Sequence, residues 1–312
     1  MVTGGAGFVG STLVDRLLAE GHSVDAVDDL STGSLINLAT ARSGRGGEFT
    51  FHQLDVRSAD LRELMARRRP EVVFHLAAQT DAGVSTARPL FDAEVNILGS
   101  LQVLEASRIA GVSKVVFASS GAIYGEPPSA AIPIKESQPQ LPLTVGGVAK
   151  KAVGDYLLAY RDRYNLEFTA LALANVYGPR QVAGGDASVV ATFAGRLLGG
   201  EPCTIFGDGT QTRDFVYVDD VVDAFARAAG RGSGLLMNLG TGVETTVNDL
   251  YRVMAAAAGS DRRALNRLPG SGAPDRSCLD PSRAAIHLGW KPWTPLAEGV
   301  AATLEWHRTS AR

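Results

Sequence analysis

Glycine occupies positions 4, 7 and 10, between a short apolar stretch and a run with helical periodicity. Glycine permits a sharp turn and lets the backbone approach an anion closely, and the free N–H groups and dipole of a helix N-terminus favour negative charge. The first 18 residues therefore predict a strand, a phosphate-binding turn and a helix. The residues expected to contact the anion are Gly4, Gly7, Phe8, Val9 and Gly10, and those expected to form the apolar helix face are Leu13, Val14, Leu17 and Leu18.

The residues after this helix give the glycine spacing its specificity, since 35 glycines among 312 residues produce such spacings by chance. Gly21 lies where the helix should end, and residues 24–27 predict a second strand that ends at Asp28. Asp28 follows Gly10 by 18 residues, close to the roughly 20 residues at which a carboxylate binds the adenosine ribose hydroxyls. Because a carboxylate repels a 2′-phosphate, the pattern favours NAD over NADP. The alternative is a glycine-rich turn followed by an ordinary surface aspartate.

The composition argues against several classes of protein. Hydrophobic residues make up 45% of the chain and charged residues 20%, as in globular proteins that bury a core. The net charge of −3 predicts no broad basic surface, so neither nucleic acid nor an anionic membrane is an expected partner. Cys203 and Cys278 lack Cys or His partners at metal-ligand spacing, so no metal site is expected and both should be buried bystanders. No apolar run approaches the roughly 18 residues that cross a bilayer, and a cytoplasmic location is expected.

Strand and helix patterns alternate after the first turn, which predicts a parallel sheet covered by helices on both faces. Only Met1, Val2 and Thr3 precede the turn, fewer than the usual five or six residues of a strand, so either this strand is shortened or the true start lies upstream. The other expected strands are 49–54, 72–77, 114–119 and 167–173, and the expected helices are 90–110 and 150–161. The strand ends that should line a cofactor crevice carry Asp28, Asp55, Ala77, Ala78, Gln79, Ser119, Ser120 and Asn175.

The pattern changes near Tyr177, which suggests a second domain. Residues 1–176 are predicted to form a doubly wound, Rossmann-type α/β domain that binds NAD. Residues 177–312 are predicted to form a smaller α/β substrate domain, with a segment near 210–240 returning to the first domain. The features expected there are a loop at 184–186, a turn at 207–209, a strand at 235–239, a Pro/Gly-rich loop at 269–274, helices at 188–198, from Asp219 and at 247–257, and a last helix with Leu304 and Trp306.

Six motifs resemble, in order, those of the extended short-chain dehydrogenase/reductase family, and within it the nucleotide-sugar epimerases of the UDP-galactose 4-epimerase type. They are TGGAGFVG at 3–10, DDLSTG at 28–33, HLAAQ at 75–79, SSGAIYG at 119–125, NVYGPR at 175–180, and FGDG at 206–209 leading to RDFV at 213–216. The resemblance covers nearly the whole chain. The further cofactor-binding residues that it implies are Asp29, Leu30, Ser31, Gly33, Asp55, Val56, Leu76, Ala77, Ala78, Gln79, Asn96, Ser119 and Lys150.

The resemblance implies a tightly held NAD that accepts a hydride from a sugar carbon and returns it to the other face. In the family a tyrosine four residues before a lysine is the base, and the lysine ammonium and the nicotinamide ring lower the phenol pKa. A Ser or Thr hydroxyl completes the relay. Lys150 and Ser120 match the lysine and the hydroxyl. The alternative for Lys150 is a solvated helix lysine.

The tyrosine is missing, because the position four residues before Lys150 is Gly146. Gly146 and Gly147 together should weaken the first turn of the helix by roughly 1 kcal/mol each relative to alanine. Neither Ser120 nor Thr144 can replace a phenol, since an alcohol has a far higher pKa and needs a base of its own. The other tyrosines considered, which lack this spacing, are Tyr124, Tyr156, Tyr160 and Tyr177.

A second departure lies at the substrate end. The family usually has Arg-x-Gly-Asp ahead of the stretch that corresponds to 276–280, with the arginine on the substrate pyrophosphate, whereas residues 270–273 here are GSGA. Losing a bidentate guanidinium contact should weaken substrate binding. Arg213 remains at the other family position for diphosphate, with a surface ion pair as its alternative, and Arg276 or Arg267 is a candidate substitute. The substrate-binding residues implied are Ser120, Asn175, Val189, Arg213 and Arg276.

Several of these residues have a structural alternative. Asn175 matches a family residue near the substrate diphosphate, or is a turn or capping asparagine. Asn96 either bonds to the crevice or fixes its helix to a loop, and Asp55 either flanks the adenine with Val56 or caps the next helix. Gly121 and Ala122 stand where the family's dehydratases and decarboxylases carry acidic residues, so those two reactions lose support.

Three hypotheses for function remain open. The first is an NAD-dependent 4-epimerase for UDP-sugars of the UDP-glucose/UDP-galactose type, slow because water over Gly146 or a sugar hydroxyl relay replaces the phenol. The second is an NAD-binding pseudoenzyme or partner subunit without turnover. The third is a drifted or engineered sequence in which Gly146 is a lesion. The helices near 90–110 and 148–161 are those that the family packs into a dimeric four-helix bundle, so the resemblance implies a homodimer.

Overall fold

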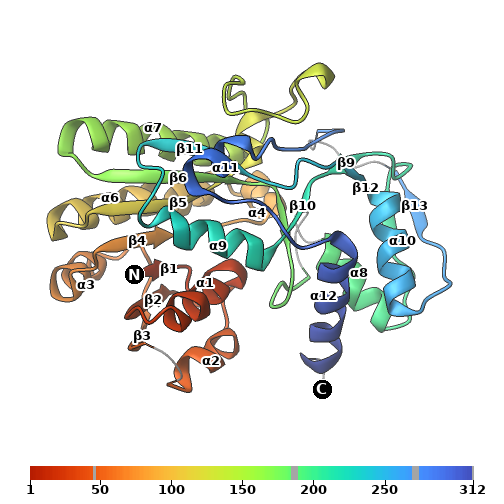
Figure 1. Ribbon diagram of the computed structural model, residues 1–312, viewed down its shortest axis with the longest axis horizontal. Coiled ribbons are helices and arrows are strands. Elements are labelled where there is room, and N and C mark those ends of the chain that lie inside the picture. Colours follow the sequence, from red (N-terminus) through yellow and green to blue (C-terminus); the bar gives the residue numbers. More distant parts are fainter. Residues whose placement is uncertain (45–46, 184–188, 269–273, 311–312) are drawn as a thin grey trace.

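The computed structural model describes residues 1–44, 47–183, 189–268 and 274–310. A central sheet of seven strands, in the order β11-β6-β5-β4-β1-β2-β3, crosses the larger part of the molecule (Figure 1), and every neighbouring pair in it is parallel. Its strands are β1 (Val2–Thr3), β2 (Val24–Asp28), β3 (Phe49–Gln53), β4 (Val72–His75), β5 (Lys114–Ser120), β6 (Glu167–Leu173) and β11 (Leu235–Leu239).

The two-residue strand β1 lies between β2 and β4, where the order of the strands reverses. In open α/β sheets the loops at such a switch point diverge and leave a crevice at the carboxyl ends of the strands. The glycine turn follows β1 and therefore opens onto this crevice. This arrangement confirms the predicted doubly wound fold.

Helices cover both faces of the sheet, because successive side chains of a strand point to opposite faces. Val115 and Phe117 of β5 pack with one cluster of core residues, beneath α3, α6 and α7, whereas Val116 packs with the other, beneath α1 and α9. The helices of the first face are α3 (Asp60–Arg68), α6 (Gly99–Ala110) and α7 (Val145–Tyr164), and those of the second are α1 (Phe8–Ala19), α9 (Val218–Ala228) and α11 (Ser282–Leu288).

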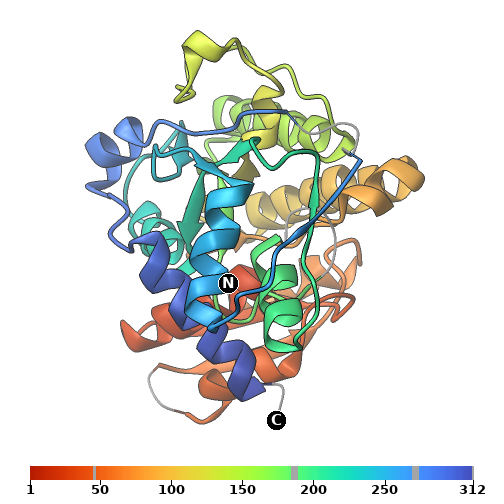
Figure 2. The same ribbon diagram turned by 90° about the vertical axis from the view of Figure 1, so that its right-hand side faces the viewer.

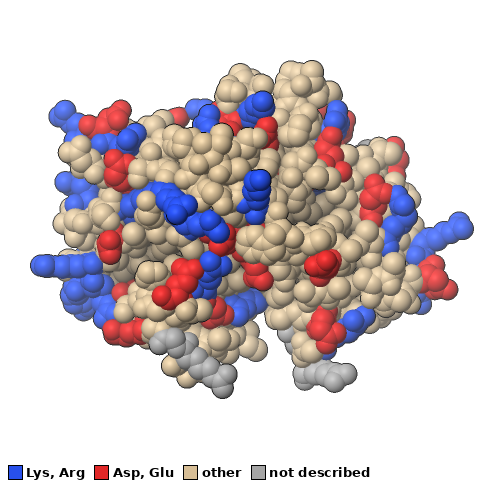
Figure 3. All heavy atoms as spheres, in the orientation of Figure 1, with Lys and Arg blue, Asp and Glu red and all other residues tan. Residues whose placement is uncertain are grey.

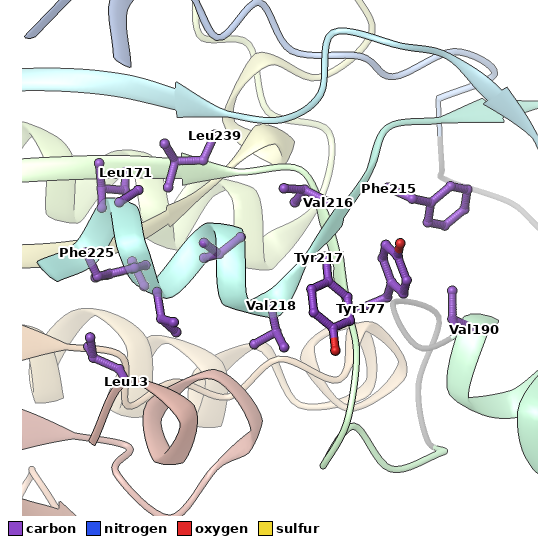
Figure 4. Close-up of a cluster of buried hydrophobic side chains, with 14 of the residues drawn as sticks. Leu13, Leu171, Tyr177, Val190, Phe215, Val216, Tyr217, Val218, Phe225 and Leu239 are labelled. Carbon is purple, nitrogen blue, oxygen red and sulfur yellow. The ribbon is translucent and has the colours of Figure 1, made fainter. Parts of the chain in front are cut away.

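The C-terminal part packs beside the end of the sheet (Figure 1, Figure 2). Its helices α8 (Val189–Leu198), α10 (Val247–Ala258) and α12 (Leu296–Ser310) pack on one another. The buried cluster in Figure 4 runs without a break from Leu13 and Phe225 under the sheet to Tyr177, Phe215 and Val190 beside α8. Because one apolar core joins both parts, the sheet fixes where the C-terminal helices stand.

The remaining strands of the described residues form three short pairs. They are β7 (Asn175–Tyr177) with β10 (Phe215–Tyr217), β8 (Thr204–Phe206) with β13 (Leu265–Arg267), and β9 (Thr212–Arg213) with antiparallel β12 (Thr245–Thr246). After β10, the chain enters α9 and then β11, which pairs with β6. Residues 218–239 therefore return to the main sheet.

Several predicted elements differ from the observed ones. The expected helix 90–110 consists of α5 (Pro89–Ala93), a π-helical turn η2 (Glu94–Leu98) and α6, and it follows the short helix α4 (Ala82–Ala87). Strand β3 ends at Gln53, one residue before the expected limit, and β4 ends at His75, two residues before it. The expected loop at 184–186, Ser188 and most of the loop at 269–274 lie outside the described residues.

The remaining short helices are 3-10 helix η1 (Leu35–Leu38), helix α2 (Ala39–Arg42), and 3-10 helices η3 (Gly121–Tyr124) and η4 (Ser129–Ala131). Within the described ranges, no helix is long and apolar enough to cross a membrane. Basic and acidic side chains are interspersed over the face shown in Figure 3. Both cysteines, Cys203 and Cys278, are fully buried and free, as expected.

Candidate active site

The glycine turn is packed so closely that side chains are excluded at two of its three positions. A Cβ atom on Gly10 would lie 2.0 Å from the carbonyl oxygen of Gly4, and one on Gly4, whose φ is +69°, would lie 2.7 Å from the Ala77 nitrogen. Real Cβ contacts are essentially never shorter than 3.0 Å. The turn after β1 therefore touches the loop after β4, with Phe8 and Val9 opening α1 beside it.

Asp28, which is predicted to bind the adenosine ribose, also fixes the backbone of the glycine turn. Its carboxylate is buried and accepts hydrogen bonds from the backbone N–H groups of Ala6 and Leu30, both at 2.9 Å. Burial raises the pKa of the carboxyl, and these two bonds oppose that rise. A Cβ atom on Gly33 would lie 2.7 Å from Asp28 Oδ1, so the glycine keeps the carboxylate accessible from that side. Asp29 lies outside this cluster and accepts from Ser31 N and Oγ.

Asp55 and Val56 lie directly after β3. Asp55 accepts from the backbone and guanidinium of Arg57, which lowers the pKa of its carboxyl, whereas the residue that precedes the next helix, α3, is Ala59. The alternative in which Asp55 caps that helix is therefore wrong. Val56 is buried, and its Cγ2 lies 3.2 Å from the position of a Cβ atom on Gly99.

The loop after β4, residues 76–79, is fixed to the π-helical turn by one amide. Asn96 Oδ1 accepts from Gln79 N at 2.8 Å and its Nδ2 donates to Gln79 O at 2.9 Å. The same Nδ2 donates to Asp92 Oδ1 at 3.0 Å. Of the two alternatives for Asn96, the one in which it fixes its helix to a loop is confirmed. Leu76, Ala77 and Ala78 are half-buried in this loop, and the backbone of Leu76 and Ala77 lies against Gly4 of the glycine turn.

The buried side chain of His75 joins β1, which precedes the glycine turn, to helix α6. His75 Nδ1 is 2.7 Å from Thr3 Oγ1 and His75 Nε2 is 2.8 Å from Ser100 Oγ, which donates to the Asn96 carbonyl at 2.6 Å. Burial and, secondarily, the Lys150 charge lower the pKa of His75 to about 3, so the ring is neutral at physiological pH. A neutral histidine with both nitrogens engaged is a structural tie between β1, β4 and α6.

Ser119 and Ser120 end β5, and Gly146 and Lys150 lie near the start of α7, which packs against β5 and η3. Ser120 Oγ accepts from Ala122 N at 3.1 Å, and Thr144, which caps α7, accepts from Gly147 N at 3.1 Å. Nothing lies within 4 Å of the position that a Cβ atom on Gly146 would take. The place of the missing side chain is therefore open.

Lys150 is not a solvated helix lysine, so that alternative is wrong. It is half-buried, its ammonium donates to the Ala118 carbonyl at 2.8 Å, and the same Nζ lies 4.8 Å from the centroid of the Phe117 ring. Burial lowers its pKa to about 8, and the charge of Asp92 opposes this fall. Near neutral pH a measurable fraction of such an amine is unprotonated, which is the condition for accepting a proton.

The described tyrosines named as possible substitutes for the phenol are engaged elsewhere or exposed. Burial raises the pKa of Tyr124, whose hydroxyl donates to Asn238 Oδ1 at 2.8 Å, and the Tyr160 hydroxyl donates to Glu105 at 2.7 Å. Tyr177 lies in the apolar core and bonds the Leu296 carbonyl, and Tyr156 is exposed. None of these contacts involves Ser120 or Lys150.

Arg213 lies in β9 and Asn175 in β7, which belong to two different two-stranded sheets. The Arg213 guanidinium is half-buried, donates to the Thr212 carbonyl at 2.7 Å, and makes no ion pair within the described ranges, so the ion-pair alternative is wrong there. Burial lowers its pKa. Asn175 lies in β7, paired with Phe215, and not in a turn or cap. Val189, half-buried, is the first residue of α8.

Arg276 has a protein partner. Its guanidinium makes a two-pronged contact with the carboxylate of Glu244, which also accepts from Thr212 Oγ1. Arg213 and Arg276 therefore differ in their availability to an anion. Residues 270–273, which replace the family's Arg-x-Gly-Asp segment, lie outside the described residues.

Two buried carboxylates of this region were not predicted. Asp92 accepts from Ser85 and Asn96, and Asp214 accepts from Thr241, Gly242 and Leu279. Asp92 precedes Asn96 by four residues, the spacing that places two polar groups on one helix face, and that signal was available in the sequence. Asp214 gave no signal, because its partners are far from it along the chain.

The comparisons with known proteins extend over the whole chain. A model of the NAD dependent epimerase/dehydratase family matches residues 1–240. The UDP-glucose 4-epimerase of Mycolicibacterium smegmatis is 48% identical over 314 residues, covering 100% of this chain and 99% of that protein. The solved structure of a Thermotoga maritima UDP-glucose 4-epimerase with UDP-glucose has a TM-score of 0.94 and 42% identity, over 100% of this chain and 99% of that one. A Thermus thermophilus UDP-glucose 4-epimerase in complex with NAD has a TM-score of 0.91 and 39% identity, over 98% of both chains.

These matches confirm the resemblance drawn from the six motifs, and they confirm NAD as the cofactor of the family and sugar-nucleotide epimerisation as the class of reaction. The sheet order and the crowded glycine turn fit such a cofactor independently of the comparisons. The sequence, the fold and the full-length relatives agree that this chain belongs to the NAD dependent epimerase/dehydratase family.

Proposed function

We propose that this protein is a UDP-glucose 4-epimerase, which interconverts UDP-glucose and UDP-galactose by transient oxidation at C4. The observation that carries the proposal is the half-buried Lys150, whose ammonium bonds the Ala118 carbonyl near the carboxyl end of β5, together with the open place at Gly146 and a glycine turn that excludes side chains. The relatives named above, similar over their full length, support the substrate. Bound NAD supplies the acceptor and donor of the hydride.

The residues that would hold NAD lie along the crevice in the order of the strands. The glycine turn would hold the pyrophosphate, Asp28 the adenosine ribose, and the loop fixed by Asn96 the nicotinamide half. Residues 1–176 with 218–239 would form this domain, because those segments share the sheet. The residues proposed for the cofactor are Gly4, Gly7, Phe8, Val9, Gly10, Asp28, Asp29, Leu30, Ser31, Gly33, Asp55, Val56, Leu76, Ala77, Ala78, Gln79, Asn96, Ser119 and Lys150.

The base in this proposal is the amine of Lys150. Residues four apart share a helix face, so the open place at Gly146 lies one turn from Lys150 on the same face of α7. Solvent there would carry the proton of the sugar hydroxyl to the amine, and Ser120 would hold the hydroxyl. Proton transfer through an extra molecule is less efficient than transfer to a positioned phenol, so turnover should be slow.

The experiment is an assay of UDP-glucose and UDP-galactose interconversion by the purified protein, with its NAD content measured after denaturation. Wild-type turnover that is lost in Lys150→Met, with NAD retained, would support the proposal. Bound NAD without any turnover would instead support the pseudoenzyme hypothesis. Protein that neither contains nor binds NAD would contradict both.

Arg213 should matter more for substrate affinity than Arg276. Arg213→Gln is expected to raise the KM for UDP-glucose by about 10- to 100-fold, the value of roughly 1.5–3 kcal/mol for a hydrogen bond to a charged group. Arg276→Gln should raise KM by less than about threefold, because Glu244 already binds that guanidinium. Steady-state kinetics on both variants measure the difference, and an equal or reversed order would contradict it.

We also propose a homodimer formed through α6 and α7. Leu98, Ile109 and Leu158, on or next to these helices, are between 48% and 55% exposed, although they are large and apolar. Covering such residues is favourable. Comparing the sedimentation of the wild type with that of a variant carrying charged residues at positions 109 and 158 tests this proposal.

The free, buried cysteines fit a reducing compartment such as the cytoplasm.

A further inference from the structure

A carboxylate lies inside the protein without any role in the proposed cofactor or substrate contacts. Asp92 on α5 is fully buried, and its Oδ1 accepts from Ser85 Oγ at 2.6 Å and from Asn96 Nδ2 at 3.0 Å. Its Oδ2 has no hydrogen-bond partner in the described part of the chain. Because a buried charge is costly unless another charge compensates it, a cation should act on this carboxylate.

Lys150 is that cation. Helix α5 packs against α7, and the charge of Asp92 acts on the Lys150 ammonium. Both residues are described, and the structure records no ion pair between them, so the carboxylate acts from beyond direct contact. The ammonium is held on its other sides by the Ala118 carbonyl and the face of the Phe117 ring.

The other titratable groups near Lys150 do not compete for it. His75 on β4 is neutral and bonded to Thr3 and Ser100. The remaining titratable groups on the elements packed against α7 have partners elsewhere, namely Glu94 with Arg57, Glu105 with Arg108, Lys114 with the Arg231 carbonyl, Tyr124 with Asn238 and Glu167 with Arg161.

We propose that Asp92 is a positioning residue for Lys150, with its buried carboxylate fixed by Ser85 and Asn96 so that a negative charge faces the lysine amine from α5. The inference deepens the proposed function. It rests on that function only in taking the amine of Lys150 as the base. Asn96 also fixes the loop after β4. The same side chain therefore holds both that loop and the carboxylate of Asp92 in place.

The proposal predicts the pH at which Lys150 becomes a base. A negative charge favours the protonated amine, so removing it in Asp92→Asn should lower the pKa of Lys150, by about one pH unit, the lower end of the effect of an opposite charge. The neutral amine then predominates at a lower pH, and the rising limb of kcat/KM against pH should move down by the same amount.

The test is NMR titration of the full-length protein as purified, with ¹³C in the lysine side chains. The chain has five lysines, at 114, 135, 150, 151 and 291, so the spectrum is simple, and Lys150→Met assigns the signal. Lys114 is the internal control, because burial also lowers its pKa to about 8 while its ammonium bonds the Arg231 carbonyl at the opposite end of β5. Asp92→Asn should shift Lys150 and leave Lys114 unchanged.

Ser85→Ala is the matched variant, since it removes one hydrogen bond to Asp92 and keeps the charge. It should leave the pKa of Lys150 close to that of the wild type. An unchanged Lys150 pKa in Asp92→Asn would overturn the proposal. Equal shifts of the Lys150 pKa in Asp92→Asn and Ser85→Ala would also overturn it, because they would indicate a change in packing and not the loss of the charge. If the pKa moves as expected in a protein without epimerase activity, the proposed function fails and the role of Asp92 stands.

Discussion

Replacing Gly146 with tyrosine is expected to raise kcat for epimerisation by about 10²- to 10⁴-fold, the range that a positioned general acid–base group contributes. The backbone at Gly146 is helical, and nothing lies within 4 Å of the place of a Cβ atom, so a side chain can be added there without a clash at Cβ. The Lys150 ammonium, one turn further on, would lower the phenol pKa by its charge. Steady-state rates with UDP-galactose measure the gain.

Gly146→Phe is the control for this gain, because it supplies the same ring without a hydroxyl. It should be no faster than the wild type, and slower if it displaces solvent from the Gly146 position. If the tyrosine and phenylalanine variants are equally active, or if the wild type is within tenfold of the tyrosine variant, the phenol is not required here. Both variants replace a helix glycine, so a similar gain in stability is expected for each.

A methyl group on Gly10 should disable the cofactor site. The Cβ atom of Gly10→Ala would lie 2.0 Å from the Gly4 carbonyl oxygen, so the glycine turn must shift. We expect the free energy of unfolding to fall by about 1–3 kcal/mol, as for overpacked sites. The Kd for NAD should rise by at least about 10- to 100-fold, since a shifted turn misplaces N–H donors worth roughly 1.5–3 kcal/mol each. Calorimetry with NAD and denaturant titration measure the two effects.

Gly154→Ala on α7 is the matched control for Gly10→Ala. Gly154 lies in the helix interior, where nothing is within 4 Å of an added Cβ atom. Alanine there should stabilise the fold by up to about 1 kcal/mol and leave NAD affinity unchanged. An NAD affinity in Gly10→Ala equal to that of Gly154→Ala would contradict the proposed contact between the turn and the pyrophosphate.

The doubly wound fold could be predicted because its signals are local. Apolar runs bounded by turn residues gave β2, β5, β6 and β11 almost to the residue, and Gly21, at φ +87°, lies just past the end of α1 as expected. The limit of β4 was less accurate, two residues too late, because a strand ends where its neighbour stops pairing. The π-helical turn in the expected helix 90–110 was not predictable, because it lies where Asn96 bonds the loop after β4.

The candidate site also has some features that the sequence predicts and others that depend on distant segments. Lys150, Ser120 and the absence of a tyrosine follow from the order of residues, whereas the pairing of Arg276 with Glu244 depends on two segments 32 residues apart. The carboxylate of Asp28 was predicted for a ribose, and the structure adds that it braces the turn through Ala6. Contacts between residues far apart in the sequence produce no periodic pattern from which they could be predicted.

The sequence by itself determined the glycine turn, the alternation of strands and helices, the family and the empty position at 146, because each depends on residue identity at short spacing. Only the tertiary structure decided that Lys150 is half-buried under the influence of Asp92, and that Arg213 and Arg276 differ in availability to an anion. These features depend on burial and on contacts between distant segments, and both arise only when the chain packs into one core.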